Sequence, residues 1–245
     1  ITAMHLHLSD EMHPFNSEEI EKESFIPIVE ESKTLHQEIT TVFKVTMDIE
    51  TEIADMANEG DYDLLLVGLG KSIFEGTILG KVIGFTTRII NPDRLIDKFT
   101  GKEGLFENSP FDERTRQIIS KTKMPLGILV DKDLQNVNQI FIPIFSSEDA
   151  FLLDYAQKLI FNNDSQVAIL DVYGNVNSNF VVQSALESLE QKYPENISLL
   201  DDRIVKKEFL AQQDMMIISL ESWKALVDSR SVWLSGVPSV LILKS

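Results

Sequence analysis

Short apolar runs alternate with amphipathic stretches along most of the chain. Continuous apolar runs at 64–67, 126–130 and 215–219 are typical of strands that are covered on both faces of a parallel sheet. Apolar residues at helical spacing in 147–160 and 180–193 predict amphipathic helices between the strands. This alternation predicts an α/β fold that is built on parallel sheets.

The first half of the chain contains eight predicted segments. They are a strand at 1–8, a loop at 10–23, a helix from Ser24 to Gln37 with Pro27 in its first turn, a strand at 39–45, a helix at 50–58 ending at Gly60, a strand at 62–67, a helix that begins at Ser109 and Pro110 and ends before Pro125, and a strand at 126–130.

The second half restarts the same alternation after the polar stretch 131–138. The predicted elements are strands at 139–144, 167–172, 197–200, 215–219 and 240–243, with helices at 147–160, 180–193, 205–212 and 221–228 between them. We therefore predict two domains, at 1–133 and 138–245.

The two halves align as an internal repeat. YDLLLVG at 62–68 aligns with QDMMIIS at 213–219, and MPLGILV at 124–130 aligns with VPSVLIL at 237–243. The connection between these strands is longer in the first half, which predicts an insert at about 81–109. The first half has no counterpart of 139–160, so its opening strand and helix are expected upstream of Ile1.

Composition narrows the function classes. The net charge of −17 argues against nucleic acid and anionic lipid as general partners. The absence of cysteine excludes disulfides, thiolate metal sites and thiol catalysis. No apolar run approaches the roughly 18 residues that a membrane span needs, so we expect no direct membrane insertion by this chain.

Two glycines mark a candidate site for an anion. Gly68 and Gly70 follow an apolar strand, and ligands of open α/β sheets bind at the carboxyl ends of strands. If a nucleotide or another anion binds there, Gly68, Gly70 and Lys71 are expected to contact its phosphates. The net-basic segment 81–123 supplies a second set, Lys81, Thr86 and Arg88. The alternative is a strand that is followed by an ordinary turn.

Other chemistry is weakly represented. His5 and His7 lie close to His13, Asp10 and Glu11, but their spacing defines no complete ligand set, and two histidines at a sheet edge are the simpler interpretation. We expect no metal. The sequence contains no GxSxG, no Walker lysine motif and no HExxH, so we expect that the protein is not an enzyme.

The residues Asp63 to Gly68, then Gly70 and Gly80, with 116–122 before Pro125, resemble the universal stress protein family. The resemblance implies two tandem Rossmann-like units of the adenine nucleotide alpha hydrolase-like type, with parallel five-stranded sheets that pair through their final strands. It also implies an ATP or AMP site that includes Gly80. The sequence departs from the family's glycine pattern, because one residue separates the first two glycines and Lys81 replaces the hydroxyl residue.

A narrower resemblance is carried by 74–95 (FEGTILGKVIGFTTRIINPDRL), 104–129 and the terminal PSVLILK. These segments are similar to the cytoplasmic carboxyl-terminal region of bacterial cation/proton (Na+/H+) antiporters. The resemblance implies a regulatory, ligand-sensing module at the cytoplasmic side of the inner membrane, whose partner is the transporter's own membrane domain upstream of Ile1. A homodimer of whole chains is compatible with this. The alternative is a free-standing tandem universal stress protein that binds ATP or AMP.

Overall fold

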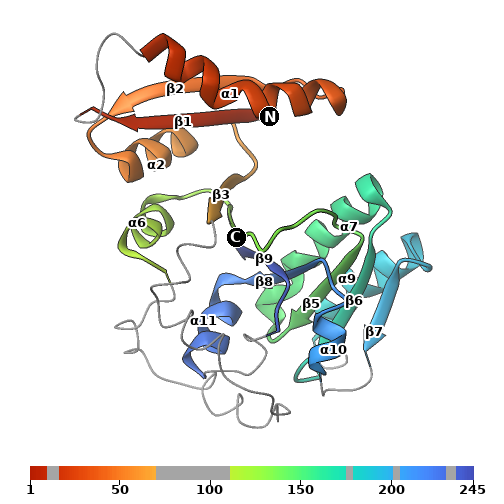
Figure 1. Cartoon of the computed structure of the whole chain (residues 1–245). Coiled ribbons are helices and arrows are strands. Elements are labelled where there is room, and N and C mark those ends of the chain that lie inside the picture. Colours follow the sequence, from red (N-terminus) through yellow and green to blue (C-terminus); the bar gives the residue numbers. More distant parts are fainter. Residues whose placement is uncertain (10–16, 70–110, 175–178, 201–204, 230–235) are drawn as a thin grey trace. The chain divides into compact units, whose positions relative to one another are not determined.

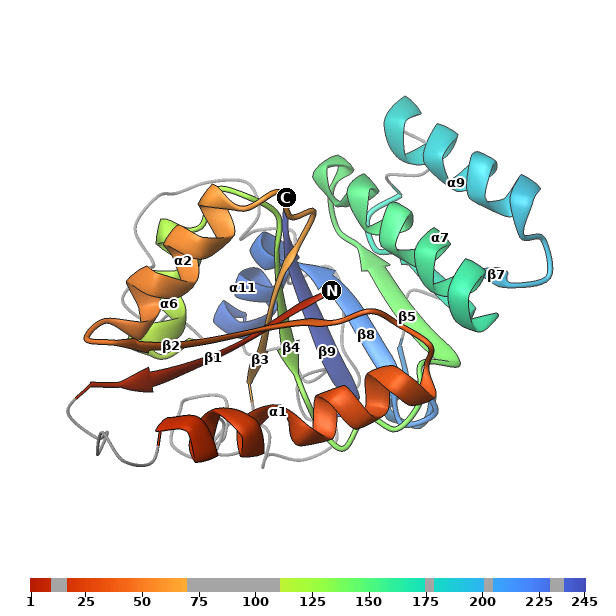
Figure 2. The ribbon, with the colours of Figure 1, turned by 90° about the horizontal axis from the view of Figure 1, so that it is seen from above.

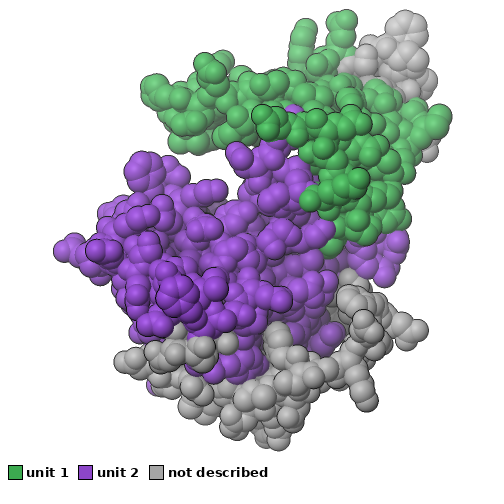
Figure 3. Space-filling view, turned by 180° about the vertical axis from the view of Figure 1, so that it is seen from behind, with its two compact units in different colours: residues 1–61, 117–123 green, residues 62–116, 124–245 purple. Residues whose placement is uncertain are grey.

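The protein was analysed as a computed structural model, which describes residues 1–9, 17–69, 111–174, 179–200, 205–229 and 236–245. The described chain divides into two compact units, coloured separately in Figure 3. Unit 1 contains 1–61 and 117–123, and unit 2 contains 62–116 and 124–245. The predicted insert 81–109 lies outside the described residues, and the predicted domains 1–133 and 138–245 stay a prediction.

Unit 1 is built on two parallel strands. Strand β1 (Thr2–Leu8) pairs with β2 (Thr40–Thr46), with Thr2 opposite Thr40 and Leu8 opposite Thr46. Helices α1 (Ser17–Thr34) and α2 (Ile49–Glu59) both contact β1. The predicted end of α2 is confirmed, since Gly60 caps it and donates its N–H to the Met56 carbonyl.

Helix α1 corrects the prediction for the first segment. Its start at Ser17 lies seven residues before the predicted Ser24, so that Pro27 stands inside the helix rather than in its first turn. The segment 18–23 is rich in glutamate, a good helix former, and Glu18 and Glu19 favour a helix start because they complement the helix dipole. The acidic stretch that we predicted as a loop is therefore partly helical.

Unit 2 contains a seven-stranded sheet. Its strands are β3 (Leu65–Leu69), β4 (Leu126–Val130), β5 (Gln139–Ile144), β6 (Gln166–Asp171), β7 (Ile197–Leu200), β8 (Met215–Ser219) and β9 (Ser239–Lys244). The order is β3-β4-β9-β8-β5-β6-β7 (Figure 1), and Figure 2 shows β3, β4, β9, β8 and β5 side by side in this order. Every pair is parallel except β4–β9.

The helices of unit 2 connect these strands. They are the 3-10 helix η2 (Ser147–Phe151), α7 (Leu152–Asn163), α9 (Phe180–Lys192), α10 (Lys207–Leu210) and α11 (Leu220–Asp228). A further helix, α6 (Glu113–Lys121), begins after Asp112, whose carboxylate accepts the N–H of Thr115. The helix start predicted at Ser109 and Pro110 lies outside the described residues. No helix in the described ranges combines the length and apolar character needed to cross a bilayer.

A hydrophobic core of unit 2 forms around β5. Ile140, Ile142 and Ile144 are fully buried and pack with apolar residues of α7, α9, β6 and β8. Burial of the side chains on both faces of β5 explains why its sequence is apolar almost throughout. The apolar stripes of α7 and α9 contribute Leu153 and Leu186 to this core, as the helical spacing predicted.

The α/β fold with mostly parallel sheets is confirmed, whereas the five-stranded sheets are not. The described residues form one sheet of seven strands and one of two. Strands β4 and β9 pair antiparallel, with Ile128 opposite Ile242. This pairing joins β3 and β4 to the other five strands in one sheet, which is why the sheet has seven strands rather than five. This pairing confirms that the final strands of the two halves join.

Candidate functional site

Of the residues predicted to bind an anion, Gly68 is described and the others are not. Gly68 lies in β3 and is exposed, and a Cβ atom built on it would meet no atom of the described residues within 4 Å. Gly70, Lys71, Gly80, Lys81, Thr86 and Arg88 lie outside the described residues. The predicted nucleotide site therefore stays a prediction.

The second half of the chain provides a better defined candidate. Strand β5 leads to β6 on one side, whereas β8 lies on its other side and is reached later in the chain. The order of the strands thus reverses between β5 and β8, and ligands of open α/β sheets bind in the crevice at such a switch point, at the carboxyl ends of the strands. These ends are marked by Ile144 and Ser219.

A buried carboxylate occupies this switch point. Asp149 is 1% exposed, and its Oδ2 atom accepts the peptide N–H groups of Phe145 and Ser146 at 2.8 and 2.9 Å. The Ser222 hydroxyl donates to the same carboxylate, at 3.2 Å from Oδ1 and 3.1 Å from Oδ2. The carboxylate, the two N–H groups and the hydroxyl therefore satisfy one another by hydrogen bonds within the fold rather than binding a ligand.

The Asp149 network depends on two helix starts. Asp149 lies in η2, directly after β5, and turns its side chain back to the end of that strand. Ser222 lies in the first turn of α11, where its own N–H is accepted by the Ser219 hydroxyl at 3.2 Å. A helix therefore begins soon after each of the two strands, and neither connection is a glycine-rich loop that would leave space for phosphates.

Two aromatic side chains lie beside the Asp149 network. Phe145 is 2% exposed and makes an edge-to-face contact with Tyr173, at 6.0 Å between ring centroids. Burial raises the pKa of the Tyr173 phenol to about 12.

The sequence did not identify Asp149 or Ser222. The end of β5 reads Pro143-Ile144-Phe145-Ser146, which has no acidic residue at its tip, and the acid that reaches the tip comes from Asp149 in η2. The spacing of Ser146 and Asp149 was a signal for this contact. An acidic residue three positions after a serine is typical of a helix start, and the acidic side chain there accepts the N–H of the serine.

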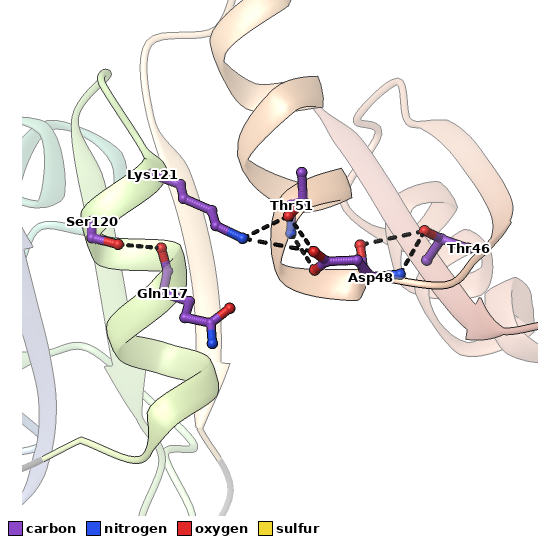
Figure 4. A network of polar contacts seen from close by, with 6 residues as sticks. All are labelled: Thr46, Asp48, Thr51, Gln117, Ser120 and Lys121. Carbon is purple, nitrogen blue, oxygen red and sulfur yellow. Dashed lines mark hydrogen bonds and ion pairs between the residues drawn. The ribbon is translucent and has the colours of Figure 1, made fainter.

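Unit 1 contains a separate polar network, shown in Figure 4. The Asp48 carboxylate accepts the N–H of Thr51 at 2.9 Å and so caps α2, while the Thr51 hydroxyl also donates to it. Lys121 donates to the Thr51 hydroxyl at 2.6 Å and lies 3.8 Å from Asp48. The lysine is therefore already paired with a carboxylate, which disfavours an anion site there.

His5 of β1 packs against two aromatic rings. The His5 ring stacks on Phe43 at 5.6 Å between centroids and meets the edge of Phe25 at 6.3 Å. Within the described residues no group of three or more histidine or carboxylate side chains is arranged to hold a metal ion. His13, Asp10 and Glu11 lie outside the described residues, so the metal hypothesis for them is not tested.

Comparison with known proteins identifies the fold. No protein-family model matches the sequence, and no curated protein matches it. Among solved structures, the cytoplasmic domain of a prokaryotic cation chloride cotransporter matches 99% of this chain and 84% of its own length, with 15% identity and a TM-score of 0.55. A universal stress protein from Archaeoglobus fulgidus matches 98% of this chain and 84% of its own length, with 11% identity and a TM-score of 0.52.

The chain has a universal stress protein-like fold. The predicted resemblance to universal stress proteins and to transporter cytoplasmic domains is confirmed at the level of the fold. In this universal stress protein-like chain, the switch point of the second half is filled by its own side chains, Asp149 and Ser222. The aligned strand of the first half carries Gly68, which is exposed among the described residues.

Proposed function

We propose that this chain is a cytosolic regulatory, ligand-sensing module of a bacterial cation/proton antiporter, which acts by binding and conformational change rather than by catalysis. It would lie at the cytoplasmic side of the inner membrane, and its partner would be the transporter's own membrane domain upstream of Ile1. The observation that carries the proposal is the similarity, over 99% of the chain, to the cytoplasmic domain of a prokaryotic cation chloride cotransporter.

Two further observations support a regulatory role. The resemblance of 74–95 and 104–129 to cation/proton antiporters supports this transporter class over a chloride cotransporter. The Asp149–Ser222 network fills the position where a nucleotide would otherwise enter the second half. A half that has no open switch point is suited to transmitting a change by packing, with ligand sensing left to the first half.

The proposed architecture is a pair of tandem universal stress protein-like units. The sequence alignment of 62–68 with 213–219 supports it, as does the pairing of β4 with β9 at the join between the halves. In the seven-stranded sheet, the neighbouring strands β9-β8-β5-β6-β7 would form the five-stranded unit of the second half. The first half would be the same unit without its opening strand and helix.

The attachment to a transporter is tested by the size and location of the native protein. An antibody against this chain is expected to detect, in the source cells, a band far heavier than the 27.8 kDa of the chain. The band should stay with the membrane pellet after an alkaline carbonate wash, which removes peripheral proteins. A band near the mass of the chain in the cytosolic fraction would contradict the proposal.

A second candidate function is a free-standing stress protein that binds ATP or AMP at the first half. The exposed Gly68, at the carboxyl end of an apolar strand, favours it. Calorimetric titration with ATP and AMP tests it directly, and Gly70→Asp should abolish a signal that arises from this loop. Heat of binding together with a cytosolic location would select this candidate over the antiporter module.

A further inference from the structure

Lys132 lies in the polar stretch 131–138, which leads from β4 to β5. Its peptide N–H donates to the Ser239 hydroxyl at 2.9 Å. Its Nζ atom donates to the Val237 carbonyl, also at 2.9 Å. Lys132 therefore ties the connection between the two halves to the start of β9.

The side-chain amine of Lys132 has one hydrogen-bond partner, whereas an ammonium group can have three. The Val237 carbonyl accepts one of its N–H groups. Within the described residues no carboxylate pairs with this amine. The Asp131 carboxylate accepts the Leu134 N–H, and the Asp214 carboxylate accepts two N–H groups at the start of β5. Two N–H groups of the ammonium are therefore left without an acceptor in this part of the chain.

The surroundings of Lys132 disfavour its charge. The residue is partly buried, and its partners Val237 and Ser239 are 6% and 2% exposed. Burial lowers the pKa of the Lys132 amine below the ordinary value of a lysine. A second basic residue, Lys207 of α10, packs against Gly236, directly before Val237. An amine in such surroundings is neutral, and hence nucleophilic, at a lower pH than a solvated lysine.

Lys44 shows the opposite environment. Its Nζ atom lies 2.5 Å from the Glu52 carboxylate, and its side chain is 46% exposed. The hydrogen bond to Glu52, and then the attraction of its charge, raises the pKa of the Lys44 amine. Lys121 and Lys224 are likewise paired with carboxylates. Lys132 differs from these three lysines because it is partly buried and unpaired.

We propose that Lys132 is a modification site, at which the side-chain amine is acylated by a small acyl phosphate. The neutral amine attacks the acyl carbon, so that a C–N bond forms and the bond between the acyl carbon and the phosphate oxygen breaks. The phosphate leaves with the electron pair of that bond, and the nitrogen releases one proton to water. An anionic acyl donor suits the site, because no carboxylate of the described residues pairs with the amine. The inference does not depend on the proposed function.

The acylated side chain suits this position better than the ammonium group does. The amide nitrogen keeps one N–H, which can still donate to the Val237 carbonyl. Acylation removes the charge that burial disfavours, together with the two N–H groups that have no acceptor among the described residues. Because Lys132 is only partly buried, the acyl group has access to solvent. The tie between the connection and β9 is therefore kept.

Acetylation of the whole chain with acetyl phosphate tests the proposal. The folded protein is treated with a limiting amount of the reagent at mildly alkaline pH. The protein is then unfolded in urea, and its remaining lysines are acetylated with deuterated acetic anhydride. Mass spectrometry of the digested protein gives the light-to-heavy ratio at each lysine. Lys132 should be modified at least about fivefold faster than Lys44, because a larger fraction of its amine is neutral.

Three controls separate the effect of the fold from that of the local sequence. When the first reaction is carried out in urea, Lys132 and Lys44 should be modified at equal rates, because burial and ion pairing are lost. Lys132→Arg should remove the fast-reacting site and leave the ratio at every other lysine unchanged. Glu52→Gln should raise the rate at Lys44 and leave the rate at Lys132 unchanged, since Glu52 is the carboxylate that holds Lys44 protonated.

The fit of the product is measured separately, with acetyl-lysine incorporated at position 132 during synthesis. The urea midpoint of this protein should equal or exceed that of the unmodified chain, because the hydrogen bond to Val237 is kept. A lower midpoint would overturn the proposal. It would also be overturned if Lys132 in the folded protein reacted no faster than Lys44, or if its faster reaction persisted in urea.

Discussion

The Ser222 hydroxyl donates to the Asp149 carboxylate at 3.1 and 3.2 Å, and this contact joins the carboxyl ends of β8 and β5. Both side chains are 1% exposed. The crevice that open α/β sheets use for ligands is therefore closed in the second half by the protein's own polar groups. We interpret this end of the sheet as part of the packed fold rather than as a binding site.

Asp149→Ala should lower the free energy of unfolding by about 3 kcal/mol, because it leaves two peptide N–H groups and one hydroxyl buried without their acceptor. Urea unfolding followed by circular dichroism measures this change. Asp154→Ala is the matched control, since this carboxylate is exposed on α7, and it should change stability by less than about 0.5 kcal/mol. Equal losses in the two variants would contradict the role of Asp149.

Tyr173 should be the last tyrosine to ionise in the folded protein. Burial raises its pKa to about 12, so its contribution to stability is present below the ordinary value near 10 and is lost as the pH rises through about 12. A titration of phenolate absorbance should show a late component that Tyr173→Phe removes. A late component that persists in Tyr173→Phe would assign the raised pKa to another tyrosine.

Asp48 should make the stability of α2 sensitive to acid. The hydrogen bond from the Thr51 hydroxyl, then that from its N–H, lowers the pKa of Asp48. The contribution of Asp48 to stability is therefore present above the ordinary pKa of an aspartate, and it is lost as the pH falls through the lowered pKa. The protection of the α2 amides against exchange, relative to the intrinsic rate at each pH, should decrease as the pH falls through this range in the native chain. In Asp48→Asn, which keeps an acceptor oxygen, the decrease should be weaker, and an unchanged profile would contradict the assignment.

Leu66 and Ile217 occupy aligned positions in the two halves but should respond differently to the same substitution. Leu66→Ser should cost less than about 1.5 kcal/mol, because the side chain is 56% exposed, whereas Ile217→Ser should cost more than about 3 kcal/mol from a fully buried site. Urea unfolding of both variants gives the comparison. Similar losses would mean that the edge of β3 is covered in solution.

Much of the fold was predictable from local patterns. Strands β4, β7 and β8 have the predicted bounds, because each is a short apolar run between polar turns. Helix α1 begins seven residues before the predicted start, because the glutamates before Pro27 extend the helix and place this proline inside it. Local patterns identify elements better than they identify helix ends.

The candidate site was less predictable for a physical reason. Asp149 and Ser222 are 73 positions apart, and only the pairing of β5 with β8 brings them together. The β4–β9 pairing was expected from the family resemblance, whereas the division of the described strands into a sheet of seven and a sheet of two was not. Gly68, by contrast, could be proposed from the sequence alone, since a glycine at the end of an apolar strand is a local feature, and its role in binding stays a prediction.

The most direct test of the central claim is proton flux in membrane vesicles that contain the native transporter. Cation-dependent proton flux is followed with a pH-sensitive dye for the full-length protein and for a form that ends before Ile1. The regulatory account predicts that both forms catalyse exchange and that the dependence of the rate on pH or ligand is lost in the shorter form. Identical regulation in the two forms would contradict it.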